Sequence, residues 1–167
     1  MKNSADEPTS IPWFLTLSWG WLIVASVIDQ VLHKLLHWQP LMCVNVLELW
    51  SIVQASWLIK VDRRSQAIYW FAAEYILGLL YIFVPLLHRA HVGLIIFVIL
   101  GVSVLIAGRF VFRRDMLRYF NEVNETGLTL SPWMSLFFGT IYFQYHFNEI
   151  AEFKMNQSLN FSQLQSK

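Results

Sequence analysis

The stretch "HVGLIIFVILGVSVLIAGRFVF", residues 91–112, decides the class of this protein. Its only charged residue is Arg109, and its length reaches the roughly 20 apolar residues that a helix needs to cross a bilayer. Arg113 and Arg114 follow directly in the sequence, and charged residues at the end of an apolar run favour the headgroup layer or water. The stretch therefore predicts a membrane-spanning helix.

The rest of the chain has the same character. Hydrophobic residues make up 56% of its 167 residues and charged residues only 14%, against about 25% charged in soluble domains. Three more apolar runs of near-spanning length come first, Pro12 to Leu32, Pro40 to Ile59 and Gln66 to Leu87. Because short loops join the runs, consecutive helices must be antiparallel neighbours. The sequence predicts an all-α integral membrane protein, a four-helix transmembrane bundle over residues 12–112.

The basic residues orient this bundle. With the N-terminal tail, residues 1–11, inside the cell, eight lysines and arginines within or beside the runs lie on the cytoplasmic side and two, Lys34 and Arg89, on the other. Positively charged flanks resist translocation, so we expect an N-in, C-in protein of the plasma (inner) membrane. Aromatic rings favour membrane interfaces, which suits Trp57 near an inner helix end, whereas Trp19 and Trp21 lie deeper and need a packing explanation.

Beyond the fourth run the pattern becomes amphipathic. Residues 113–127 predict a cytoplasmic helix that keeps Met116 and Phe120 on one side and ends at Gly127. Ser131 can cap a further apolar helix, and because that helix is short for a span, we favour an interfacial or re-entrant helix over residues 128–153 to a fifth crossing. Residues 154–167 predict a flexible tail. A small or polar stripe should pack the helix on the bundle: Ser135, Gly139, Tyr142, His146 and Glu149.

Polar residues inside apolar runs are costly in lipid and are the first candidates for a site. Asn45 and Glu48 share one face of the second run, and Glu74 lies in the third. If Glu48 and Glu74 approach each other, at least one holds a proton, which would make a proton-relay or cation site. We favour the alternative, in which each is neutral or paired, Glu74 with Arg109 for example, and fixes the helix register.

Two further patterns have competing interpretations. Gly93, Gly101 and Gly108 line one side of the fourth run, where small residues let helices approach closely; we favour internal packing over an oligomer face. A polar group at the outer ends of the runs contains imidazole and carboxylate, which can bind zinc or copper. We favour a metal-free interfacial cap for this group: Asp29, His33, His37, His88 and His91.

The remaining features narrow the function. A net charge of +1 argues against a nucleic-acid partner, and the single cysteine, Cys43, excludes an internal disulfide. Catalytic motifs are missing, and we expect neither enzyme activity nor a cofactor. We expect a small structural, accessory or immunity-type subunit that binds lipid and a membrane protein partner or a second copy. The alternatives are a solute or ion carrier using Glu48 and Glu74, and a metal-dependent membrane enzyme using the outer histidines.

Overall fold

A computed structural model describes residues 11–36, 46–80, 91–123 and 127–165, and within these ranges it is helical without strands. The prediction of an all-α protein is therefore confirmed for the described part of the chain. A short 3-10 helix opens it, and a π-helical turn follows the longest apolar helix. The elements are η1 (Trp13–Thr16), α1 (Trp19–Leu36), α2 (Val46–Val61), α3 (Ala67–Leu80), α5 (His91–Arg118), η4 (Tyr119–Val123) and α6 (Pro132–Gln165).

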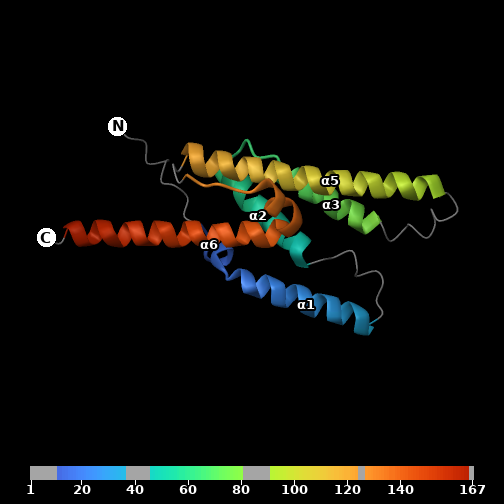
Figure 1. The fold of residues 1–167 in the computed structure, drawn as a ribbon, viewed down its shortest axis with the longest axis horizontal. Coiled ribbons are helices and arrows are strands. Elements are labelled where there is room, and N and C mark those ends of the chain that lie inside the picture. Colours follow the sequence, from blue (N-terminus) through green and yellow to red (C-terminus); the bar gives the residue numbers. More distant parts are fainter. Residues whose placement is uncertain (1–10, 37–45, 81–90, 124–126, 166–167) are drawn as a thin grey trace.

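The helices α1, α2, α3 and α5 reverse direction in turn along the long axis of the molecule, and α6 then runs the same way as α5 (Figure 1). α1 and α3 run away from the end at which α6 finishes, whereas α2 and α5 return toward it (Figure 1). α3 packs along α5, while α1 diverges from them (Figure 1). This is the antiparallel order that short loops predict.

The membrane prediction is supported only in part. Among the described residues, one helical stretch, Gly93–Glu122, is long and apolar enough to cross a membrane, while Trp19–Leu32 and Ala67–Leu80 are apolar but shorter. A four-span bundle is not supported by these ranges. In the second apolar run, the described helix α2 buries Ser51, Gln54 and Trp57 inside the protein.

The molecule has two unlike halves. In the apolar half, made by α1, α3 and residues 93–106 of α5, large aliphatic side chains such as Val27, Ile76 and Ile99 are exposed. In the packed half, made by η1, the second half of α2, residues 108–123 and α6 beyond residue 139, aromatic side chains are buried. The core of the packed half contains Trp57, Phe112, Met116, Phe120, Phe143 and Phe147.

The tryptophans differ from the sequence prediction. Trp57, expected at a membrane interface, is buried and stacks on Phe120 with 6.2 Å between ring centroids. Trp19 and Trp21, expected to need packing, are exposed at the start of α1. The prediction was wrong because it counted distance along each run and could not see which faces of α2 would be covered by α6.

α6 begins where the sequence predicts, at Pro132, with the Ser131 Oγ accepting from the Met134 N–H at 3.4 Å. It kinks at Gly139, where φ is 37° and ψ is −112°. Beyond the kink it runs to Gln165, away from the apolar half (Figure 1). The interfacial or re-entrant placement expected for residues 128–153 stays a prediction. Only residues 132–138 stay at the junction of the two halves, and the helix includes most of the segment expected as a flexible tail.

Candidate functional site

Arg109 stands at the junction of the two halves, where four helices meet. Its Nη2 donates to Glu74 Oε1 on α3 at 3.3 Å. Its Nη1 donates to Ser51 Oγ on α2 at 3.0 Å and to Thr140 Oγ1 on α6 at 3.4 Å. The guanidinium carbon also lies 5.1 Å from the centre of the Phe71 ring, a cation–π contact. One buried cation thus joins α2, α3, α5 and α6.

The kink in α6 makes room for this cation. A Cβ placed on Gly139 would lie 2.9 Å from Arg109 Nε, closer than real side chains approach. Gly139 also has a positive φ, which residues with a Cβ adopt only with strain. Glycine is therefore required twice at this position, for the backbone angle and for the approach of the guanidinium.

A second polar centre, Gln144, lies one turn further along α6. Its Nε2 donates to the carbonyls of Leu15 at 2.6 Å and Leu17 at 2.8 Å. Its Oε1 accepts from Trp50 Nε1 at 2.8 Å and from Gln54 Nε2 at 3.0 Å. Gln144 therefore fastens the segment before α1 and the middle of α2 to α6.

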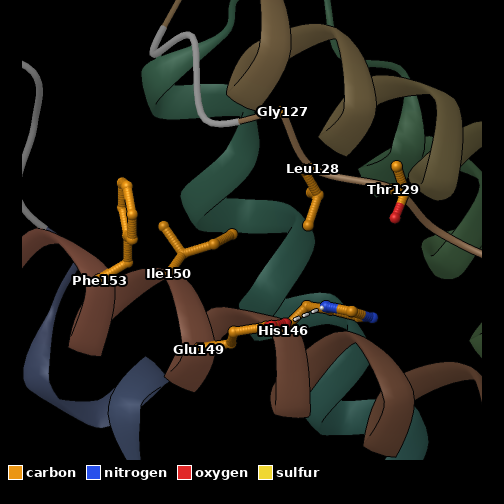
Figure 2. Close-up of a pocket in the computed structure, with 7 residues that line it drawn as sticks. All are labelled: Gly127, Leu128, Thr129, His146, Glu149, Ile150 and Phe153. Atoms are coloured by element: carbon orange, nitrogen blue, oxygen red, sulfur yellow. Dashed lines mark hydrogen bonds and ion pairs between the residues drawn. The ribbon is translucent and has the colours of Figure 1, made fainter.

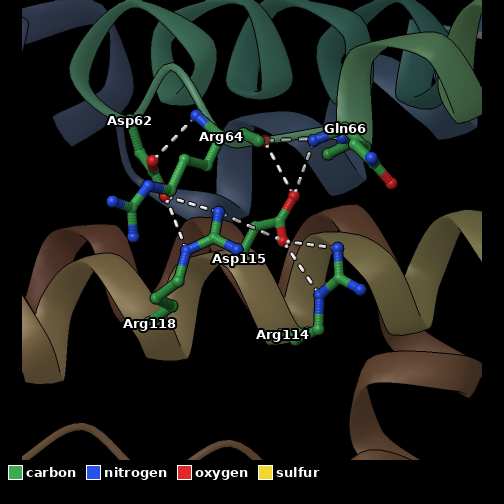
Figure 3. A network of polar contacts seen from close by, with 8 residues as sticks. Asp62, Arg64, Gln66, Arg114, Asp115 and Arg118 are labelled. Atoms are coloured by element: carbon green, nitrogen blue, oxygen red, sulfur yellow. Dashed lines mark hydrogen bonds and ion pairs between the residues drawn. The ribbon is translucent and has the colours of Figure 1, made fainter.

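A third centre joins the turn between α2 and α3 to α5 (Figure 3). Asp115 is fully buried and accepts from Ser65 Oγ and from the Gln66 N–H, both at 2.9 Å. Arg114 and Arg118 supply the positive charge, with Arg114 Nη2 at 3.0 Å and Arg118 Nη2 at 3.5 Å from Asp115 Oδ1. Because Asp115 accepts an N–H ahead of α3, it fixes the start of that helix from α5.

Arg109 is one of the four intramembrane polar residues predicted from the sequence, and two of the other three lie near it. Glu74 is its ion-pair partner, and Glu48 lies one turn before Ser51 on α2. Glu48 Oε2 and Gln54 Oε1 are buried without a hydrogen-bond partner among the described residues. Asn45 lies outside the described residues. The sequence interpretation missed Ser51 and Thr140, although Ser51 follows Glu48 on the same helical face.

The outer polar cap is described only in part. Asp29 and His33 lie on α1 and His91 opens α5, while His37 and His88 lie outside the described residues. Among the residues that the structure describes, no group of three or more histidine, cysteine or acidic side chains could hold a metal ion. The metal hypothesis gains no support from the described members and stays a prediction.

The glycines of α5 have different surroundings. A Cβ on Gly108 would lie 3.5 Å from the Trp70 Cβ, so α3 packs directly on this position. A Cβ on Gly101 would meet no atom of the described chain within 4 Å. Gly93 lies in the first turn of α5. The sequence predicts close helix packing at all three glycines. The structure shows it at Gly108, where α3 approaches α5.

The stripe on α6 turns mostly inward. Ser135 and His146 are buried, and the Tyr142 hydroxyl accepts from the Ser131 N–H at 2.9 Å. The imidazole Nδ1 of His146 lies 2.8 Å from Glu149 Oε2 (Figure 2). Both residues line a cavity of about 200 Å³, whose other walls are Gly127, Leu128, Thr129, Ile150 and Phe153 (Figure 2).

Comparison of the chain with protein-family models, with curated proteins and with solved structures finds no match. The class of protein therefore rests on the fold alone. In the part of the chain that the structure describes, it is an all-helical protein with one candidate membrane-spanning helix. Its polar side chains form interhelical networks at the junction of an apolar half and a packed half.

Proposed function

We propose that the chain is a small integral membrane protein of four spans, with both ends in the cytoplasm, that serves as an accessory subunit for a membrane protein partner. The apolar half and the first half of α2 would lie in the bilayer, and the packed half on its cytoplasmic side. The support for insertion is the exposure of aliphatic side chains along residues 93–106 of α5, which hydrocarbon would cover at no cost.

One observation on α1 carries the partner-binding part of the proposal. Ser26, Gln30 and Lys34 recur every four residues and form, with Val27 and Val31, a shallow groove of about 180 Å³. Gln30 and Lys34 are exposed, although the helix around them is apolar. Polar side chains on lipid-facing helices are costly, and hydrogen bonds to a neighbouring helix reduce that cost. A partner helix with matching polar groups would cover this stripe.

Photo-crosslinking tests this surface in membranes. A photoreactive residue at Gln30 should give an adduct with one membrane protein, or with a second copy of the chain. The matched control is Ile28, which is also exposed and lies about 200° around the helix from Gln30. Equal adducts from both positions, or lipid adducts alone, would contradict the proposal. Gln30→Leu should also reduce co-purification of the crosslinked protein in mild detergent.

Cysteine labelling in intact cells tests the first span and the N-in orientation. In a Cys43→Ser background, a cysteine at Trp38 should react with a membrane-impermeant reagent, and a cysteine at Ser4 should not. Reaction at Ser4 would contradict the N-in orientation. If both positions are protected in intact cells and react after lysis, the first run does not cross the membrane.

A carrier remains a second candidate because Glu48 lies near the Arg109–Glu74 ion pair. Glu48 Oε2 is buried without a partner among the described residues, so a proton or a cation there would complete its interactions. If this is the function, proteoliposomes should show proton or cation flux that Glu48→Gln abolishes. Glu122→Gln, on an exposed residue of η4, is the control and should change nothing. Absence of flux in the parent protein would end this candidate.

A further inference from the structure

The first turns of α6 carry an exposed aromatic face before the kink. Trp133 is 68% exposed and Phe137 73%, and the two rings stack with 6.3 Å between their centroids. Met134 and Phe138 on the same short segment are exposed as well. Four neighbouring large apolar side chains left open to the surroundings call for a covering surface.

Two contacts fix the position of this face along the axis of α5. The carbonyl of Leu130, just before the segment, accepts from Arg113 Nε at 2.8 Å. Gly139, just after it, lies against Arg109. Residues 132–138 are thus held between the levels of Arg109 and Arg113. At this position α5 passes from exposed aliphatic residues to the buried core, since Phe110 is still exposed and Phe112 is fully buried.

Positive charge follows on the side away from the apolar half. Arg114 has 56% of its side chain exposed, and Arg63 and Arg64 are exposed in the turn that Asp115 holds against α5. The nearby acids are engaged, because Asp62 accepts two bonds from Arg118, at 2.6 and 2.9 Å, and Asp115 is buried. The order along the molecule is therefore aliphatic, aromatic and then basic.

We propose that the aromatic face of residues 132–138 is a lipid interface. Its rings would lie at the boundary between acyl chains and headgroups, and the three arginines would meet the anionic phosphates. Aromatic residues favour this depth, and arginine adds electrostatic attraction to anionic lipids. Along the axis of α5, the aromatic face also begins where the exposed aliphatic surface of that helix ends. This inference rests on the proposed membrane insertion and adds the depth at which the protein sits.

Depth-dependent quenching tests the inference on the full chain. With Cys43 replaced by serine, single cysteines at Phe137, Ile99 and Glu152 would carry an environment-sensitive fluorophore. The protein would be reconstituted in phosphatidylcholine and phosphatidylglycerol vesicles with bromines either high or low on the acyl chains. We expect the label at Phe137 to lose more fluorescence to the shallow bromines, that at Ile99 to the deep ones, and that at Glu152 to neither.

The three positions separate the possible failures. If Ile99 is quenched by the deep bromines and Phe137 by neither set, the lipid interface is wrong while membrane insertion stands. If Ile99 is not quenched either, insertion itself is wrong. If Phe137 is quenched only after a copurifying protein has been removed, the face is a protein contact and the inference fails. All three labelled side chains are exposed, so the labels should be compatible with folding.

Discussion

The two halves of α5 both carry large apolar side chains, but these side chains are exposed in one half and covered in the other. In the first half Ile95, Ile96 and Ile99 are exposed, whereas Phe112 and Met116 in the second half, and Phe120 in the η4 turn that follows, are completely buried. The difference comes from α6, which packs beside the second half only (Figure 1). Apolar content alone therefore does not distinguish a helix face that meets lipid from one that meets protein.

Polar contacts mark the border between these halves. Arg109, Gln144 and Asp115 each join segments that are distant in sequence, and each lies at or beyond the point where α5 becomes covered. Buried networks of this kind fix one arrangement of helices when their members are satisfied. The packed half should therefore respond to mutation like a protein core, and the apolar half like a solvated surface.

The strongest test compares one large side chain from each half. Phe120→Ala removes a ring that contacts those of Trp57, Tyr119 and Phe147, and should lower the free energy of unfolding by about 3–5 kcal/mol. Ile99→Ala should change it by less than about 0.5 kcal/mol, since detergent covers that position. Reversible denaturation in one detergent, followed by circular dichroism, measures both. Equal losses would mean that the first half of α5 is also packed.

The Asp115 network gives the next largest effect. Asp115→Asn keeps the shape but removes the charge that accepts from Ser65, Gln66 and two arginines, so unfolding should become easier by about 1.5–3 kcal/mol. The same denaturation experiment applies. Glu122→Gln is the control, because its side chain is exposed and its loss of charge should be nearly neutral. A neutral Asp115→Asn would show that the turn between α2 and α3 is held by other contacts.

Much of this arrangement could be predicted from the sequence. The all-helical class, the start of α6 at Pro132 and the proximity of Glu74 to Arg109 follow from local patterns and antiparallel order. Local patterns do not give the partnership of Ser51 with Thr140, because it depends on the Gly139 kink that turns α6 back along α2. The same kink directs α6 beyond residue 139 away from the apolar half (Figure 1).

Gly139 and Gly101 should respond to alanine with opposite signs. At Gly139 a Cβ meets Arg109 and the positive φ is strained, so Gly139→Ala should cost about 1–3 kcal/mol. At Gly101 the helix is regular and the described chain leaves space, so Gly101→Ala should stabilise by up to about 1 kcal/mol through helix propensity. Thermal melting of the two variants in one detergent measures the signs. Destabilisation by Gly101→Ala would reveal a close helix contact in the apolar half.

The smallest expected effect concerns Tyr142, which holds the aromatic face to the packed half. Its hydroxyl accepts from the Ser131 N–H, the residue that caps α6, so Tyr142→Phe should cost about 0.5–1.5 kcal/mol and loosen the first turn locally. Tyr145→Phe is the matched control, since that ring is 48% exposed. Amide hydrogen exchange should be faster at Ser131 in the first variant and unchanged in the second. Residues 132–138 hold the proposed lipid interface. If lipid also orders this segment, reconstitution in vesicles should reduce the difference in Ser131 exchange between Tyr142→Phe and the parent protein. An unchanged difference would show that lipid does not order it.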